Sequence, residues 1–131
     1  ALDAALPTPE ATLADVICAS LRQAAAVLPV KAIVTYTTSG STTLRAARQR
    51  PRVPILGLSP KPETARRCAL VWGVHPVMTD DIASFSEMTA KACRIAAEED
   101  FAASGQRLVV IAGVPFGTPG STNILRIAWV D

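Results

Sequence analysis

The chain has 131 residues, a formal net charge of +2 and three cysteines. Half of its residues are hydrophobic and 18% are charged, which predicts one folded domain with a single core and excludes a disordered chain. The small net charge does not by itself indicate nucleic-acid binding, and no apolar run approaches the length of a membrane span. Three widely spaced cysteines favour buried thiols over disulfides or a zinc site. We therefore expect a cytoplasmic protein without nucleic-acid or membrane partners.

The first predicted element is a helix that follows a short linker. Residues 1–8 resemble a linker between domains, and we assign residues 9–131 to the folded domain. The Thr-Pro-Glu sequence at residues 8–10 supplies a cap, a first-turn proline and an acid, as helix starts do. Residues at helical spacing follow as the expected buried side: Leu13, Val16, Ile17, Ser20 and Ala24. Pro29 ends the helix.

Short runs of β-branched and aliphatic residues predict five strands. These runs are residues 31–36, 53–58, 74–78, 107–112 and 123–130. Pro76 favours an edge position for the third strand because proline cannot donate to a ladder. The near-continuous apolar run of the fourth strand is typical of a central parallel strand.

Three further helical patterns lie between these strands. The expected inward residues are Leu44 and Ala47 in the first, then Ala65, Cys68, Ala69 and Trp72 in the second, and Phe85, Met88, Ala92 and Ile95 in the third. A capping box at residues 84–87 opens the third helix. Strands that alternate with helices at this spacing predict an α/β sandwich with a mostly parallel sheet.

A turn rich in hydroxyl groups follows the first strand. Every residue from Thr37 to Thr43 except Gly40 is a serine or threonine. Amide groups, hydroxyls and the positive end of a helix dipole would meet there in one small volume, which suits a phosphate. The alternative is a helix cap beside a solvated turn, because serine and threonine are favoured at such positions anyway.

A second loop, from Gly113 to Thr122, is rich in glycine and proline. Glycines let a backbone approach a ligand and prolines limit its freedom. Doubly wound sheets bind ligands at the carboxyl ends of strands where the strand order reverses. If the first and fourth strands are neighbours, this loop and the hydroxyl turn face one another over such a crevice.

No other motif in the sequence predicts an active site. The chain contains neither the phosphate-loop pattern G-x-x-x-x-G-K-[ST] nor the dinucleotide fingerprint G-x-G-x-x-G. His75 is the sole histidine and has no nucleophile near it in sequence, so we expect a structural role. Asp80 and Asp81 could bind a cation or act as an acid/base pair, but a helix-entry turn is the more ordinary interpretation.

Several motifs together carry a resemblance to a known family. In chain order they are Thr37-x-Ser39-Gly40-x-Thr42, Arg50-Pro51-x-x-Pro54-Ile55, Glu63-Thr64-Ala65-Arg66-Arg67, Leu70-Val71-Trp72-Gly73-Val74-His75-Pro76-Val77 and Gly113-Val114-Pro115-x-Gly117-x-Pro119-Gly120-x-Thr122-Asn123. Each is modest alone, but the ordered series is specific. Over residues 9–130 the chain resembles the C-terminal domain of bacterial pyruvate kinases.

The resemblance implies a fold and a set of partners. The fold is a three-layer α/β/α sandwich whose five strands run in the order 3-2-1-4-5, with the fifth antiparallel. In the family, phosphoenolpyruvate, ADP, Mg²⁺ and K⁺ bind a (β/α)₈ barrel that this sequence lacks, so no cofactor is expected in this domain. The C-terminal domain instead binds phosphorylated effectors and contributes to oligomer contacts.

The resemblance also implies site residues. Those around an effector phosphate are Thr37, Thr38, Ser39, Gly40, Ser41 and Thr42, and those of the opposing loop are Gly117, Thr118, Pro119, Gly120 and Ser121. Ser41 stands where the family often has a basic residue, and Met88 lies near the position where animal forms place an arginine for a second phosphate. A fructose 1,6-bisphosphate site of the animal kind is therefore not expected; a monophosphate such as AMP or ribose 5-phosphate, a sulfate from buffer, or no effector at all stays open.

These implications lead to an expected role and to alternatives. We expect a regulatory and oligomerisation domain of pyruvate kinase that has no catalytic residues, with its own barrel as partner. The strand from Asn123 to Val130 is expected to pair with a second copy, because it would otherwise leave an apolar edge open. The alternatives are a stand-alone module that binds a phosphorylated metabolite or a protein, and a purely structural domain in which the hydroxyl turn is only a cap.

Overall fold

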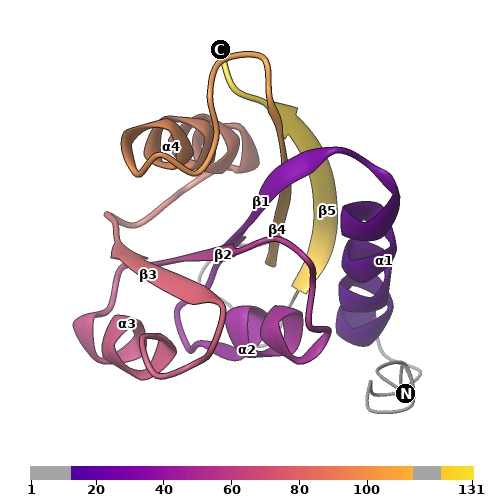
Figure 1. Cartoon of the computed structure of the whole chain (residues 1–131). Coiled ribbons are helices and arrows are strands. Elements are labelled where there is room, and N and C mark those ends of the chain that lie inside the picture. Colours follow the sequence, from indigo (N-terminus) through magenta and orange to yellow (C-terminus); the bar gives the residue numbers. More distant parts are fainter. Residues whose placement is uncertain (1–12, 114–121) are drawn as a thin grey trace.

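The computed structural model describes residues 13–113 and 122–131 (Figure 1). Its elements in chain order are α1 (Leu13–Val27), β1 (Val30–Tyr36), α2 (Ser41–Arg48), β2 (Ile55–Ser59), α3 (Pro62–Cys68), β3 (Val74–Met78), α4 (Phe85–Glu98), β4 (Arg107–Gly113) and β5 (Thr122–Trp129). The expected linker at residues 1–8 lies outside the described residues. No described helix has the length and apolar character needed to cross a membrane.

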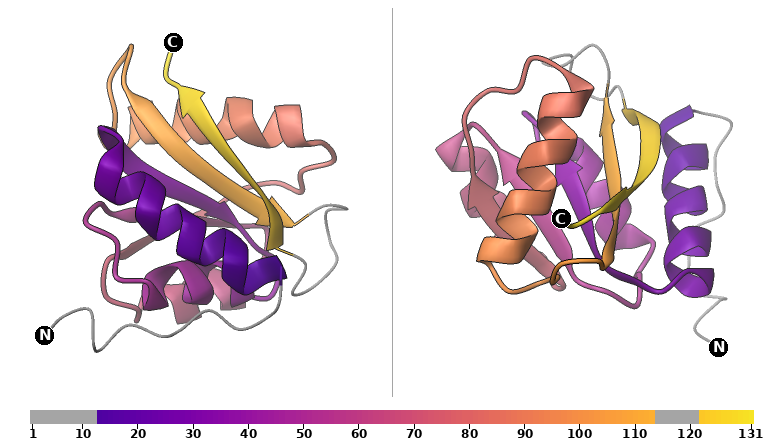
Figure 2. Two further views of the ribbon diagram at one scale, coloured as in Figure 1. Left: turned by 90° about the vertical axis from the view of Figure 1, so that its right-hand side faces the viewer. Right: turned by 90° about the horizontal axis from the view of Figure 1, so that it is seen from above.

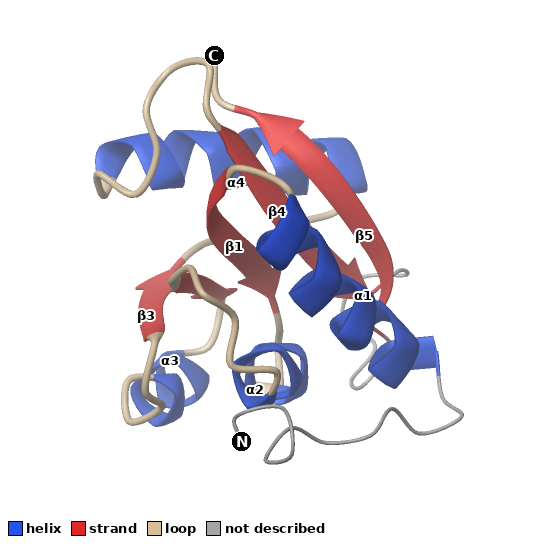
Figure 3. Cartoon of the chain, turned by 45° about the vertical axis from the view of Figure 1, so that its right-hand side comes forward, coloured by secondary structure: helices blue, strands red, loops and turns tan. Residues whose placement is uncertain are grey.

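The sheet confirms the expected strand order. It runs β3-β2-β1-β4-β5, with parallel pairing up to β4 and antiparallel pairing between β4 and β5 (Figure 3). Pro76 lies in β3 at one edge, as its missing amide donor predicted. β5 forms the other edge. Since β1 and β4 are neighbours, their carboxyl ends lie at the same side of the sheet.

Helices cover both faces of the sheet, so the three-layer architecture is also confirmed. α1 lies on one face and α4 on the opposite face (Figure 2), while α3 packs against β2 and β3 near α2 (Figure 1). The cluster beneath α1 and α2 contains Leu21, Ile33, Ala46, Ile55 and Val109. The cluster beneath α4 contains Val34, Leu56, Met88, Ala92 and Val110. Consecutive strand residues thus alternate between two apolar layers.

The buried side of α1 differs from the expected one. Its buried residues are Ala14, Cys18, Leu21 and Ala25, whereas Leu13 is 60% exposed and Val16 is 49% exposed. The helix carries apolar residues on more than one side, so helical periodicity alone did not decide which side faces the sheet. Three of the four residues that face the sheet are small, and small side chains let a helix approach a sheet closely.

Two other expected stripes are only partly correct, since Ala47 packs against the core and Cys68 is buried but other members are not. In α2 the buried residues are Thr42, Thr43 and Ala46, while Leu44 points away and is 44% exposed. The stripe expected in the next helix required that helix to reach Trp72. Instead α3 ends at Cys68, the chain turns, and the indole of Trp72 is 91% exposed.

The start of α4 agrees with its predicted cap. The Ser84 hydroxyl accepts a hydrogen bond from the Glu87 amide at 3.2 Å, as in a capping box. The Glu87 carboxylate accepts a bond from the amide of Ala83 at 3.4 Å, one residue earlier than in the usual motif. The expected inward face is confirmed, since Met88, Ala92 and Ile95 are buried.

Candidate functional site

The hydroxyl turn joins the carboxyl end of β1 to the start of α2. Gly40 holds a left-handed conformation with φ of 96°, which a side chain would disfavour. Its amide donates to the Thr37 hydroxyl at 2.8 Å. This bond closes the turn directly before α2.

The start of α2 keeps hydrogen-bond donors available. The Ser39 hydroxyl accepts from the Ser41 amide at 3.3 Å and donates to the Ser41 hydroxyl at 3.2 Å. No acceptor among the described residues takes up the amides of Thr42 and Thr43. Unpaired amides at a helix N-terminus favour an anion, because they carry the positive end of the helix dipole.

An arginine from α3 lies at the rim of this turn. The Arg67 guanidinium donates to the Ser39 carbonyl at 3.0 Å and to the Thr64 hydroxyl at 3.3 Å. Thr64 in turn donates to the Thr38 carbonyl at 2.8 Å. Sequence reasoning placed Arg67 in a motif but not in the site. The sequence signal for this contact is the spacing of Thr64 and Arg67, which lie three residues apart in α3 and so face the same side of that helix.

Buried threonines fix the turn from below. The Thr35 and Thr43 hydroxyls are 2.7 Å apart, and those of Thr42 and Thr122 are 2.6 Å apart. Gly57 leaves room for the first pair, because a Cβ there would lie 3.2 Å from Cγ2 of Thr43. Thr122 begins β5, so the turn touches the segment that directly follows the second loop.

The predicted site residues divide into two groups. Thr37, Gly40 and Thr42 are buried, and the hydroxyls of the two threonines are engaged inside the protein. Thr38, Ser39 and Ser41 are half-buried and reach the surface. The structure brings all six together at one turn. The opposing residues Gly117, Thr118, Pro119, Gly120 and Ser121 lie outside the described residues.

Two other sequence features fall away from this turn. The His75 ring lies 5.3 Å from the Phe101 ring, between centroids, and its Nε2 lies 3.8 Å from a Glu99 oxygen. These contacts join β3 to the end of α4, which agrees with a structural role. Across the described ranges, no group of three or more His, Cys, Asp or Glu side chains could hold a metal ion.

Met88 occupies the core and not the surface. Its side chain is fully buried in the cluster beneath α4. The residue that the resemblance placed near an arginine for a second phosphate therefore points toward the sheet and supplies no positive charge.

The cysteines are free thiols, and two of them are buried as predicted. Cys18 and Cys68 are buried, while Cys93 is half-buried. Burial raises the pKa of the Cys18 thiol to about 11, and Arg45 lowers it by a smaller amount. These thiols behave as small apolar groups rather than as nucleophiles.

The Cys18 pKa predicts a loss of stability at high pH. In the unfolded chain this thiol ionises near its ordinary pKa of 9.0, but in the folded protein it ionises only near 11. Its contribution is therefore complete below pH 9 and is lost as the pH rises through 11. Urea unfolding between these pH values should show a smaller decline for Cys18→Ala than for the parent. Equal declines in the two proteins would contradict the assignment.

Comparisons with known proteins agree with this fold. The family model described as "Pyruvate kinase, alpha/beta domain" matches residues 15–128. The chain is 47% identical over 122 residues to pyruvate kinase from Methylorubrum extorquens, covering 93% of this chain and 26% of that protein. It is 37% identical over 117 residues to the Clostridium acetobutylicum pyruvate kinase, covering 89% of this chain and 25% of the relative.

A solved structure gives the same picture. The structure titled "Cryptosporidium parvum pyruvate kinase in complex with ADP" superposes with a TM-score of 0.84 at 28% identity, covering 99% of this chain and 26% of that one. The chain thus spans about a quarter of the length of the relatives that it matches. It belongs to the pyruvate kinase family and corresponds to the C-terminal α/β domain of these enzymes.

Proposed function

We propose that this chain is the regulatory and oligomerisation domain of a cytoplasmic pyruvate kinase. It binds a phosphorylated effector at the turn formed by residues 37–42 and transfers no phosphoryl group itself. In the complete enzyme, phosphoenolpyruvate, ADP, Mg²⁺ and K⁺ bind the catalytic barrel, which is this domain's partner. The free thiols suit a reducing compartment.

The observation that carries the effector proposal is the set of donors at the turn. The amides of Thr42 and Thr43 donate no hydrogen bond to any acceptor in the described part of the chain. The side chains of Ser39 and Ser41 reach the surface, and the Arg67 guanidinium lies at the rim of the turn. A phosphate offers acceptor oxygens and negative charge, and hydrogen bonds between ionised groups are the stronger ones. The same donors have no complementary anion within the described part of the chain.

The effector is a monophosphate of the AMP or sugar-phosphate type. The Arg67 guanidinium hydrogen-bonds to the turn, and the buried Met88 supplies no positive charge for a second phosphate. Binding shifts the enzyme between arrangements only if the effector binds one of them more tightly. Thr42 carries that preference, because its contact with Thr122 ties the site to the edge strand.

Calorimetric titration tests the effector proposal. We expect the parent to bind AMP or ribose 5-phosphate, and Ser39→Ala and Arg67→Gln each to weaken binding by about tenfold, since a hydrogen bond to a charged group is worth about 1.5–3 kcal/mol. Ser104→Ala is the matched control, because Ser104 is exposed in a loop before β4. Equal affinities in all four proteins would remove the site. Conversion of phosphoenolpyruvate and ADP by the chain alone would contradict its regulatory role.

The edge strand β5 supports self-association. Trp129 is 56% exposed on this strand, and the Arg107 guanidinium lies 4.3 Å from its ring centroid. An open edge offers unpaired backbone groups to a second strand, and exposed aromatic rings are favoured in protein interfaces. A second copy would cover both features at once.

Sedimentation checks this surface. We expect the parent chain to form at least a dimer at high micromolar concentration, and Trp129→Glu to be monomeric because a buried unpaired carboxylate is costly. Trp72→Glu is the control, since Trp72 is even more exposed but directly precedes β3, at the opposite edge of the sheet from β5. A monomeric parent, or a dimer that survives Trp129→Glu, would overturn the assignment.

A further inference from the structure

Arginines outnumber acids where α1 meets α2, and neither the hydroxyl turn nor the β5 edge explains this. α1 contributes Arg22, α2 contributes Arg45 and Arg48, and the segment after α2 contributes Arg50. The single acidic residue of these two helices is Asp15, which pairs with Arg45 at 3.4 Å. The positive charge of the other three arginines is therefore not balanced by either helix.

Two observations place Arg22 on the side of α1 that faces α2. Arg22 follows Asp15 by about two helical turns, so both side chains leave α1 on the same side, and Asp15 pairs with Arg45 of α2. Cys18 lies between them in α1. Burial raises the pKa of its thiol, and Arg45 and Arg48 lower that pKa by smaller amounts, which puts both guanidiniums near this side of α1.

The guanidinium of Arg22 has a buried atom without a hydrogen-bond partner. Its Nε makes no hydrogen bond within the described part of the chain, and no other buried side-chain nitrogen or oxygen atom of the described residues is in that state. An unpaired buried donor is costly, and a bound ion or water is a usual explanation for one. In arginine, Nε and one Nη form an edge that matches two oxygens of an oxyanion.

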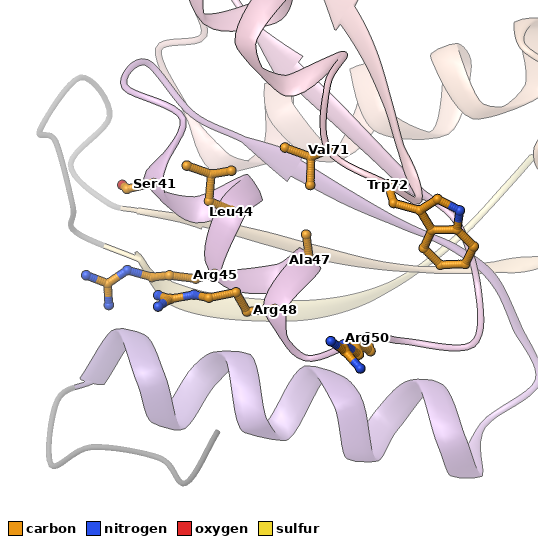
Figure 4. A pocket seen from close by; sticks show the side chains of 8 residues that line it. All are labelled: Ser41, Leu44, Arg45, Ala47, Arg48, Arg50, Val71 and Trp72. Atoms are coloured by element: carbon orange, nitrogen blue, oxygen red, sulfur yellow. The ribbon is translucent and has the colours of Figure 1, made fainter. Parts of the chain in front are cut away.

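The arginines from the α2 side are accessible. Figure 4 shows the side chains of Arg45, Arg48 and Arg50 on the side of α2 that faces α1. All three line a hollow of about 930 Å³, and neither Arg48 nor Arg50 forms an ion pair with a described residue. Arg50 also holds a φ of 50°, a left-handed conformation that residues other than glycine adopt rarely. Their guanidiniums are thus available to a ligand.

A phosphoryl group is the ligand that suits this arrangement. It carries about two negative charges at neutral pH and offers several acceptor oxygens, so it can satisfy more than one arginine. The end of α2 carries a partial negative charge of about one half, which is smaller than the charge of even one guanidinium. That dipole alone accounts for a basic residue such as Arg48 in the last turn of α2, but it leaves the buried Nε of Arg22 unexplained.

We propose that the contact between α1 and α2 is an anion site, in which the Nε edge of Arg22 and the guanidinium of Arg48 bind one phosphoryl group, with Arg50 at the rim. Below we call these three residues the α1–α2 anion site. It uses neither the hydroxyls nor the amides of the turn at residues 37–42, so it does not rest on effector binding there. Inorganic phosphate and a phosphorylated metabolite share the chemistry that it recognises.

Nuclear magnetic resonance of arginine side chains tests the α1–α2 anion site directly. In proton–nitrogen correlation spectra, Arg22→Lys identifies the Nε–H signal of Arg22 by its loss. We expect this signal to shift on titration with inorganic phosphate, but not with chloride at equal ionic strength, because a bound oxyanion accepts its proton. No shift with phosphate, or equal shifts with both salts, would overturn the proposal. A shift that follows protein concentration instead of phosphate would assign Arg22 to a second copy and would also overturn it.

A neutral substitution on α2 tests the second arginine. Arg48→Gln should weaken phosphate binding by about tenfold, read from the Arg22 signal, because a hydrogen bond between charged groups is lost. Arg126→Gln is the matched control, since Arg126 is exposed on β5 and lines a hollow beside α4. Equal phosphate affinities in Arg48→Gln and the parent would contradict the site. The backbone amide signals of the same spectra show whether each variant is folded.

Two further titrations separate this site from the hydroxyl turn and identify the source of the phosphoryl group. Ser39→Ala should leave the Arg22 titration unchanged, so failure of the effector proposal and failure of this one are distinguishable. A Ser39→Ala protein whose Arg22 signal no longer responds to phosphate would contradict a separate site. Tighter binding of ribose 5-phosphate than of inorganic phosphate would assign the site to a phosphorylated metabolite, and equal or weaker binding would assign it to free phosphate.

Discussion

Replacing Met88 with alanine should lower the free energy of unfolding by about 2–5 kcal/mol, the range for large-to-small changes in a core. Met88 is fully buried beneath α4, so alanine loses apolar contacts and leaves a cavity. Met78→Ala is the matched control, because Met78 lies on the edge strand β3 and is 52% exposed. We expect that change to stay within about 0.5 kcal/mol. Urea unfolding of both variants measures the difference.

The same position separates two interpretations of the family resemblance. If Met88 marked a lost phosphate-binding site, Met88→Arg would restore bisphosphate binding to a folded protein. The structure predicts the opposite, because a guanidinium there would be desolvated among aliphatic side chains without a partner. We therefore expect Met88→Arg to be largely unfolded by circular dichroism. A folded variant that binds fructose 1,6-bisphosphate more tightly than the parent would contradict this.

The Thr42–Thr122 hydrogen bond predicts strong non-additivity. Thr42→Val removes one hydroxyl and leaves that of Thr122, which is 1% exposed, without a partner. An unsatisfied buried hydroxyl costs about 1–3 kcal/mol of unfolding free energy. Replacing both threonines by valine removes both polar groups at nearly constant shape, so the double variant should be more stable than either single one.

The double-mutant cycle is measured by urea unfolding of four proteins. The second buried pair, Thr35 and Thr43, lies beside the same turn and provides an internal comparison, since its hydroxyls are 2.7 Å apart. The double-mutant cycles of Thr42 with Thr122 and of Thr35 with Thr43 should give coupling free energies of the same sign. Additive effects of Thr42→Val and Thr122→Val would show that the two hydroxyls do not form a stabilising bond.

The strands were accessible from the sequence because their signals are strong and local, whereas their order 3-2-1-4-5 came from the family resemblance. The apolar run of β4 predicted a central strand, and Pro76 predicted an edge. The residues of the hydroxyl turn were found for the same reason, since a dense run of threonines and serines between a strand and a helix has few roles. The structure places these residues at one turn before α2, and their role in binding stays a prediction.

The buried side of each helix was harder to predict, because a helix with apolar residues on several sides does not reveal from sequence which side meets the sheet. Leu44 and Trp72 were assigned to the core from spacing alone, but both are exposed. Spacing gives the period of a pattern and does not say which side meets the sheet or where a helix stops. Arg67 was missed as a site residue for a related reason, since its contact with the Ser39 carbonyl depends on how α3 packs against the turn.

β5 begins at the hydroxyl turn and ends at the exposed indole of Trp129. An antiparallel strand rises about 3.4 Å per residue, so these two points lie roughly 24 Å apart along one nearly inextensible segment. Pairing with β4 along its length prevents this segment from buckling. Under the proposed function, a displacement of Thr42 by an effector would pass along β5 as a movement of this stiff segment. The proposed effector turn and the proposed association edge are then separated by the length of a single strand.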